Sequence, residues 1–158
     1  MPDCSIGEDR RGRCTPPLLF MPRKSTTEKA RDDAAQGKSP STQAGEFVRE
    51  EIEHVRRGKH GAKNSKQLIA IGLSKARRAG VALPPPQAER SASGTRPKAE
   101  RDLEKGQNKE PSSGRRSRAT SRALKRSGRG AASKRALSRQ AKDAASRRKR
   151  TASKRQST

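Results

Sequence analysis

The chain has 158 residues and a formal net charge of +24, with 27% hydrophobic, 1% aromatic and 35% charged residues. This composition excludes one ordinary domain over the whole length, because so little apolar surface cannot offset the entropy of ordering the chain. We expect at most one short folded segment with disorder on both sides. No apolar run has transmembrane length, so we expect no membrane partner.

The N-terminal region is interpreted as two polar segments without a core. Residues 1–20 read as a mis-assigned N-terminal extension, because Met21 begins a stretch that resembles a natural protein start. Residues 21–40 are polar, with a weak helix predicted over Thr27–Gln36 that lacks an apolar stripe. Cys4 and Cys14 are expected to be free thiols, since two isolated cysteines do not supply the four ligands of a structural zinc site.

Residues 41–83 are the one segment where apolar residues recur at helical spacing. A first helix is predicted at about 42–57, capped by Ser41 or Thr42 and ended by Gly58. Its apolar arc consists of Ala44, Phe47, Val48, Ile52 and Val55.

Glu51 falls inside this apolar arc. One interpretation is a carboxylate at the edge of a small, wet interface, and the other is a specific pairing with a basic group on the second helix or in the loop. A buried carboxylate without a partner would be costly, so one of the two must hold. The neighbouring run of Glu50, Glu51 and Glu53 suggests a metal or acid–base pair, but we interpret these residues as solvated acids in a helix's first half.

The connection GKHGAKN, residues 58–64, places glycines beside basic side chains. Gly58 and Gly61 allow positive φ, and a basic loop before a helix N-terminus is typical of a phosphate seat. The alternative is a flexible, solvated linker.

A second helix is predicted at about 65–79, capped by Asn64 and ended by Gly80. Gly72, within the helix, indicates close approach of another helix, which is either the first helix or a second copy of the chain. The fold class is therefore all-α and small, a two-helix hairpin. Since about forty residues make a small core, we expect either a marginal hairpin or a homodimer through the apolar faces of residues 44–79.

The C-terminal half is predicted to be a linker followed by a tail. Residues 84–110 begin with three prolines and continue as a Pro-rich, mixed-charge linker. Residues 111–158 are a basic, low-complexity tail with 17 lysines and arginines and a single acid, Asp143. We expect this tail to be disordered or partly helical, and a cationic block of this kind favours polyanions as partners.

The residue pattern argues against an enzyme. His54 and His60 are the two histidines, and no Ser/His/Asp, HExxH or CxxC arrangement occurs. We therefore predict no catalytic residue, no cofactor and no bound metal.

Binding to nucleic acid is the function that the charge pattern favours. Lysine and arginine neutralise phosphates without reading sequence, and about eight contacts would give a log–log salt slope of about −7 for B-DNA. We expect DNA more than RNA, because the chain lacks an aromatic platform for stacking bases. The predicted nucleic-acid-binding residues are Lys59, His60, Lys63, Lys66, Arg77, Arg78, Arg115, Arg116, Arg118, Arg122, Lys125, Arg126, Arg129, Lys134, Arg135, Arg139, Lys142, Arg147, Arg148, Lys149, Arg150, Lys154 and Arg155.

The segment from about residue 45 to 81 resembles an uncharacterised family of small basic bacterial proteins. The family's hallmark is a KHGA…S-KQ-AIAIGLSKARRAG string, matched here from Lys59 to Gly80. This chain departs from it at Leu68, where alanine is expected, and at Lys63-Asn64, where Arg-Ser is common. The tail is similar in composition to the basic tails of linker-histone-like bacterial proteins.

The resemblance implies a bacterial, cytoplasmic protein and brings no activity. Together with the charge pattern it predicts a non-enzymatic, nucleoid-associated and histone-like DNA-binding protein. The alternative is a protein-interaction helical module whose tail binds RNA or serves localisation.

Overall fold

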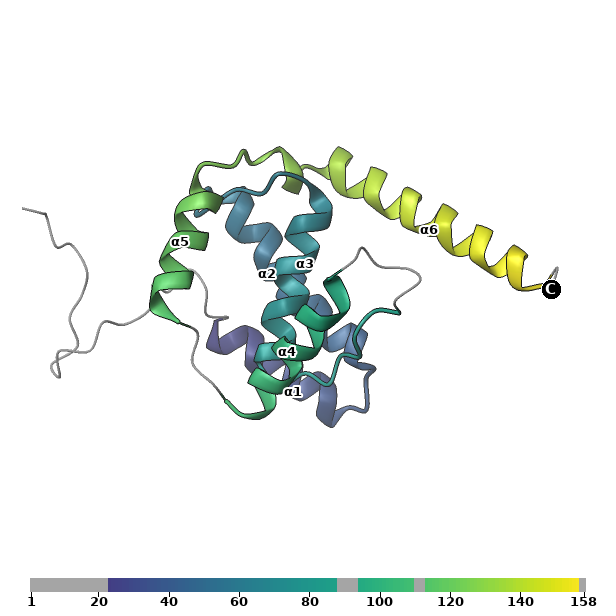
Figure 1. Cartoon of the computed structure of the whole chain (residues 1–158), viewed down its shortest axis with the longest axis horizontal. Helices are drawn as coiled ribbons and strands as arrows, with labels where there is room; N and C mark the ends of the chain where they lie inside the picture. The colour runs from purple at the N-terminus through teal and green to yellow at the C-terminus, as the bar shows by residue number, and fades with distance from the viewer. Residues whose placement is uncertain (1–22, 88–93, 110–112, 157–158) are drawn as a thin grey trace, which may run out of the picture.

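The structure, a computed structural model, describes residues 23–87, 94–109 and 113–156. Met21, Cys4 and Cys14 lie outside these ranges. Within them the fold is all-helical, as predicted, and consists of α1 (Lys24–Ala35), α2 (Pro40–Arg56), α3 (Ser65–Arg78), α4 (Thr95–Gln107), α5 (Gly114–Lys125), the 3-10 turn η2 (Gly130–Ala132) and α6 (Lys134–Gln156) (Figure 1). The two-helix hairpin is wrong as a description of the whole fold, because these ranges hold six helices.

The predicted hairpin is present as α2 and α3 and forms the centre of the fold. The side chain of Ser39 caps α2, accepting from the amide of Thr42 at 3.4 Å, so the helix begins earlier than Ser41. Pro40 fits this start because the first helical position needs no N–H donor. As predicted, Asn64 caps α3, accepting from the amide of Gln67 at 2.8 Å.

Both helices end at glycines with positive φ, which is also as predicted. Gly58 has φ +74° and Gly80 has φ +95°. The amide of Val81 then donates to the carbonyl of Ala76 at 3.1 Å, which closes the end of α3.

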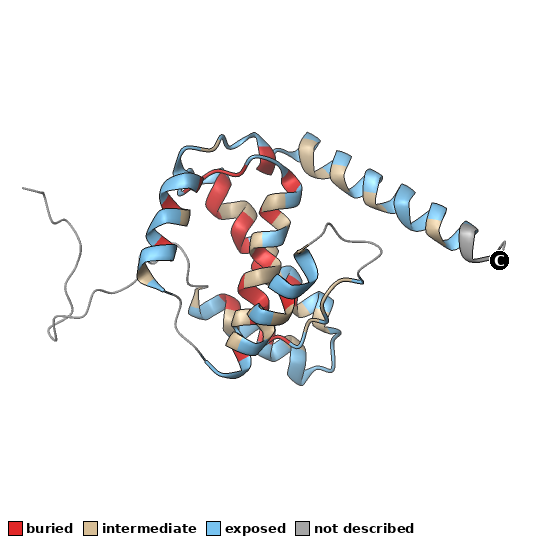
Figure 2. Ribbon diagram, viewed as in Figure 1, coloured by how far each residue is buried: buried red, intermediate tan, exposed pale blue. Residues whose placement is uncertain are grey.

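Helices α2 and α3 approach each other closely at Gly72. A Cβ at this position would lie 2.8 Å from Cα of Val48, so the neighbour anticipated from the sequence is α2 of the same chain. Buried residues run along the facing sides of both helices (Figure 2).

The apolar side chains form two buried clusters, and neighbouring elements cover both. One cluster consists of Ala30, Ala44, Phe47, Ala76 and Val81, and the other of Val55, Ala62, Leu68, Ala131 and Ala132. The clusters therefore include residues of α1 and η2 as well as of the hairpin. Dimerisation through the 44–79 faces stays a prediction, but it would require these covering elements to move.

Helix α4 lies within the segment predicted to be a linker, and it packs on α3 through polar and backbone contacts. Asp102 accepts from Ser74 at 2.6 Å and from Nε of Arg78 at 2.8 Å. A Cβ on Gly106 would overlap the carbonyl of Arg77. Because such contacts do not require apolar residues at helical spacing, the sequence of α4 shows no apolar stripe and did not indicate the helix.

The tail contributes two helices that differ in their surroundings. The end of α5 and the turn after it lie over the loop at residues 58–64, where the amide of Gly61 donates to the carbonyl of Leu124 at 2.9 Å and that of Ala62 to Gly128 at 3.0 Å. Helix α6 projects away from the other helices (Figure 1), and the tail thus takes the partly helical alternative. No helix in the described ranges is both long and apolar enough to cross a membrane.

Candidate nucleic-acid interface and a buried polar cluster

The cations predicted in the tail lie on the surface. Fifteen of the 17 have described side chains, and all fifteen are exposed. Lys154 and Arg155 lie in α6, but their side chains are outside the described part. Within that part, none of the fifteen forms an ion pair with an acid.

The fold brings some of these tail cations beside Lys59 and Lys63 of the loop and Lys66 of the first turn of α3. Lys59 lines a hollow of about 250 Å³ together with Lys125 and Arg129. Lys63 and Lys66 line a second hollow, of about 410 Å³, with Arg139 at the start of α6. Two segments more than fifty residues apart in the sequence therefore line the same two hollows, which we call the cationic edge. Periodicity and composition could not indicate this arrangement.

A third hollow lies on α6 itself and holds about 240 Å³. Arg135, Arg139 and Lys142 line it, spaced three and four residues apart, so they share one face of the helix. The acid of the tail, Asp143, lines the hollow beside Lys63 and is the one carboxylate among the described residues that line these three hollows.

Three predicted contact residues are placed away from this edge or are already engaged. His60 is buried, with 4% of its surface exposed. Arg77 is also buried and donates to the carbonyls of Leu83 at 3.3 Å and Pro84 at 3.4 Å, and its burial lowers its pKa. Arg78 forms an ion pair with Asp102. These side chains serve packing in the structure, so phosphate contact through them would require rearrangement.

The centre of the α2–α3 hairpin holds a buried cluster of charged and polar side chains. Nζ of Lys75 donates to Oε2 of Glu51 at 2.6 Å, and Nε2 of His60 lies 2.9 Å from Oε1. Glu51 therefore pairs with a basic group on the second helix and with one in the loop, which is the sharper of the two sequence-based interpretations. The solvated interpretation of the acidic run is wrong for Glu50 and Glu51, both of which are buried.

His54 completes this cluster from α2. Its Nδ1 lies 3.9 Å from Oε2 of Glu51, and its Nε2 lies 3.4 Å from Oε1 of Glu50. Oε1 of Glu50 also accepts from the backbone amide of Arg23 at 3.1 Å. The sequence contained a signal for His54 that we missed, because it lies seven residues after Phe47 and three after Glu51 on the same helical face.

Burial and neighbouring charges shift three pKa values in the cluster. Burial would raise the pKa of Glu51, but the contact with His60 and the charge of Lys75 together lower it below 4.5. The pKa of His54 falls to about 4, first because of burial and then because of Lys75. The pKa of His60 is raised by its contact with Glu51, against the effect of burial. Glu51 is thus charged and His54 neutral near pH 7.

The cluster offers carboxylate and imidazole ligands within a small space. One potential ligand atom from each of Glu51, His54 and His60 lies within 4.8 Å of the others. These are the residues of the described ranges that could hold a metal ion.

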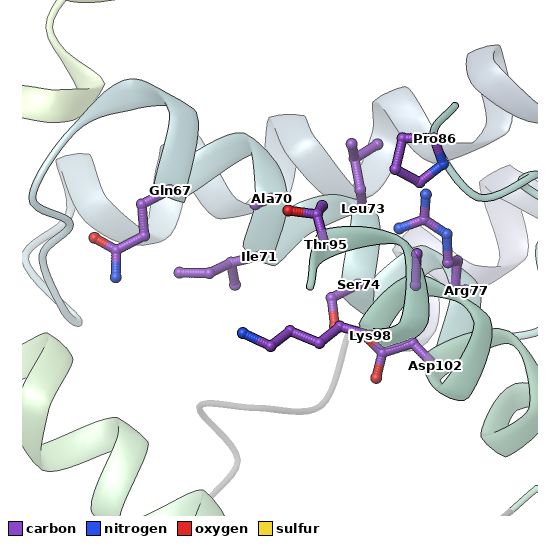
Figure 3. A pocket seen from close by; sticks show the side chains of 11 residues that line it. Gln67, Ala70, Ile71, Leu73, Ser74, Arg77, Pro86, Thr95, Lys98 and Asp102 are labelled. Carbon is purple, nitrogen blue, oxygen red and sulfur yellow. The ribbon is translucent and has the colours of Figure 1, made fainter. Parts of the chain in front are cut away.

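A separate groove of about 500 Å³ runs between α3, α4 and the proline-containing segment after Gly80. Ala70, Ile71 and Leu73 line it from α3, and Pro86 lies at one end with Gln67 at the other (Figure 3). Its walls are largely apolar, so it differs in character from the cationic edge.

No protein-family model, curated protein or solved structure shows significant similarity to the chain. The resemblance based on Lys59 to Gly80 therefore stays a prediction.

Proposed function

We propose that the protein is a non-enzymatic, largely sequence-independent DNA-binding protein, nucleoid-associated and histone-like, within the bacterial cytoplasm. It neutralises phosphates with exposed cations of α5, α6, the loop at residues 58–64 and the first turn of α3. The observation that carries this proposal is the set of fifteen exposed tail cations without an ion-pair partner in the described part of the chain. Unpaired surface cations are free to release counterions from DNA, and this release drives non-specific affinity.

Helix α6 supplies the most regular array of these cations. Arg135, Arg139, Lys142 and Lys149 recur at intervals of four, three and seven residues and so lie on one face. The first three also line the hollow on α6. An array along a protruding helix suits a phosphate backbone, whereas base reading would need side chains placed to match base edges.

Base stacking is not favoured by the described residues. Phe47 is the one aromatic residue of the Phe, Tyr and Trp class among them, and it is 1% exposed. A binder of single strands normally offers exposed aromatic side chains on which bases stack. The surface thus favours duplex DNA over single-stranded RNA.

Binding can be tested by fluorescence anisotropy of a labelled 30-bp duplex titrated with full-length protein at several salt concentrations. The variant R135Q/R139Q/K142Q/K149Q removes the four exposed cations that share one face of α6. With four fewer phosphate contacts, the slope of log K against log salt should become shallower by about 3.6. Two duplexes of different sequence should bind with the same affinity.

The matched control is K24Q/K29Q/R31Q/R101Q, which removes four exposed cations from α1 and α4 and lowers the net charge equally. It should leave the slope within about one of the wild-type value. Equal effects of the two variants would mean that only total charge matters, and an unchanged slope in the α6 variant would contradict the proposed interface.

The second candidate function is the protein-interaction helical module, and the apolar groove between α3 and α4 is the observation that favours it. Replacing Ile71 with glutamate would place a charge on the half-buried wall of this groove. If DNA binding is unchanged while a stoichiometric protein partner, captured in the presence of nuclease, is lost, the interaction module is supported.

A further inference from the structure

The buried cluster contains polar atoms that the fold leaves without hydrogen bonds. Oε1 of Glu51 and both ring nitrogens of His54 are buried and make no hydrogen bond of good geometry within the described residues, although Nε2 of His60 lies 2.9 Å from Oε1 of Glu51 and Nε2 of His54 lies 3.4 Å from Oε1 of Glu50. Leaving buried polar atoms without hydrogen bonds destabilises a fold. A cluster that holds three such atoms side by side requires an explanation, and an ion bound between them is one.

We propose that Glu51, His54 and His60 form a binding site for a divalent transition metal ion, with Zn²⁺ as the best fit. Two imidazoles and one carboxylate are a common protein ligand set for zinc and for ferrous iron. The three side chains are 1–3% exposed, and their ligand atoms lie within 4.8 Å of one another. Zinc bonds of about 2.0–2.2 Å require separations of roughly 3–4 Å, so the ligands need small shifts only.

The partners of the outward-facing nitrogens select which ring atoms would bind the metal. Nδ1 of His60 lies 3.2 Å from the carbonyl of Gly61, and Nε2 of His54 lies 3.4 Å from a carboxylate oxygen of Glu50. A metal-binding histidine usually directs its second nitrogen to a backbone carbonyl or a carboxylate in this way. Nε2 of His60 and Nδ1 of His54 are therefore left to face Glu51.

The positive charge of Lys75 opposes metal binding and should lower the affinity of the site for a divalent ion. The ammonium of Lys75 contacts Oε2 of Glu51, whereas His60 lies near Oε1 of the same carboxylate. A divalent ion on Oε1 would be repelled by this ammonium and attracted by the charge of Glu50. Removing the charge of Lys75 should therefore tighten metal binding, which is the opposite of what removing a ligand would do.

The test uses full-length protein treated with EDTA and then dialysed, in a C4S/C14S background so that thiols cannot bind the metal. Titration with Co²⁺ should produce visible d–d absorption at one equivalent, and Zn²⁺ should abolish it. His54→Gln should weaken Co²⁺ binding at least 100-fold. Glu50→Gln, which alters a positioning residue, should weaken it about tenfold.

The controls separate metal binding from loss of the fold. Glu53→Gln changes a neighbouring acid of α2 and should leave Co²⁺ affinity unchanged. Lys75→Met should bind Co²⁺ at least tenfold more tightly than the parent, which a merely unfolded variant would not do. Helicity of each variant is checked by circular dichroism.

The absence of a stoichiometric Co²⁺ spectrum in the parent protein would overturn the proposal, and so would equal affinity of the parent and the His54→Gln variant. Either result would identify the cluster as a set of structural ion pairs only. The site is independent of the cationic edge, so the α6 variant that changes DNA binding should retain the metal spectrum.

Discussion

The α2–α3 hairpin and α6 are both rich in charged residues, but they place those residues in opposite environments. In the hairpin, Glu51 and Lys75 are 1% and 3% exposed and are bound to each other. In α6, the described side chains of the cations are exposed and unpaired within the described ranges. A buried charge interacts strongly with a few fixed partners, whereas an exposed charge is hydrated and its attraction to any one opposite charge is weakened by water and salt.

This difference predicts two different responses to substitution. Removing one member of a buried pair leaves the other without compensation, so a single change in the hairpin should be severe. Removing one exposed cation should scarcely affect folding, and its effect on binding should add to those of its neighbours.

The largest effect is expected from breaking the buried ion pair. Glu51→Gln leaves the ammonium of Lys75 buried without a counter-charge and should lower the free energy of unfolding by about 3–5 kcal/mol. Urea denaturation followed by circular dichroism measures it. Glu53→Gln, on the exposed side of the same helix, should change stability by less than about 0.5 kcal/mol. Equal losses of stability in the two variants would contradict the expectation that buried charges of the hairpin matter more for folding than exposed ones.

The next effect is a dependence on pH that belongs to the hairpin alone. Because the pKa of His54 is lowered to about 4, its contribution to stability is complete above pH 6.5 and is lost as the pH falls toward 4. The loss should reach about 3 kcal/mol in metal-free protein. Glu51 adds a loss in the same direction below pH 4.5. His60 acts in the opposite direction, since its raised pKa favours the folded state at lower pH.

The measurement is urea denaturation between pH 4 and 8 with EDTA present. His54→Gln should remove the His54 contribution, so the stability difference between the two proteins should narrow or reverse as the pH falls. A difference that does not vary with pH would contradict the assignment to His54.

A smaller effect should come from the close approach of α2 and α3. Gly72→Ala places a methyl group against the backbone of Val48 and should cost about 1–3 kcal/mol through overpacking. Gly45→Ala, within α2 and with nothing nearby, should instead stabilise by about 1 kcal/mol through helix propensity. Thermal unfolding of the two variants should therefore shift in opposite directions.

The smallest effect is expected on α6. Lys149→Gln should change the free energy of unfolding by less than about 0.5 kcal/mol and make the salt slope of DNA binding shallower by about 0.9. Anisotropy titrations and urea denaturation of the same preparation test both statements. A large loss of stability would show that α6 is integrated into the core rather than projecting from it.

The sequence predicted the helices that rest on apolar periodicity and caps. The bounds 42–57 and 65–79 differ by two residues or fewer from those of α2 and α3, and Asn64, Gly58 and Gly80 have their predicted roles. The weak helix predicted over Thr27–Gln36 is present as α1 (Lys24–Ala35). Helix α4 was missed because it docks through contacts such as Gly106 on the carbonyl of Arg77, which carry no apolar pattern.

The candidate sites were predictable in part. The exposure of the tail cations follows from their charge, and Glu51 was recognisable as a carboxylate in an apolar arc. That Lys75 and His60 both reach it depends on how the loop turns back over the hairpin. The sequence of the loop does not predict this conformation, because the residues that hydrogen-bond to the loop and to the start of α3 are 124–132, more than sixty positions later.

The length of α6 determines how many phosphate charges of a DNA duplex lie alongside it. Its 23 residues extend about 34 Å, which is close to one turn of B-DNA. Duplex DNA carries about one negative charge per 1.7 Å, so this length presents about twenty phosphates. Helix α6 carries ten lysines and arginines and one acid. The charge of one α6 helix would thus compensate about half of the phosphates on one turn, and the remainder must be compensated by the cations of α5 and the loop or by α6 of a second chain.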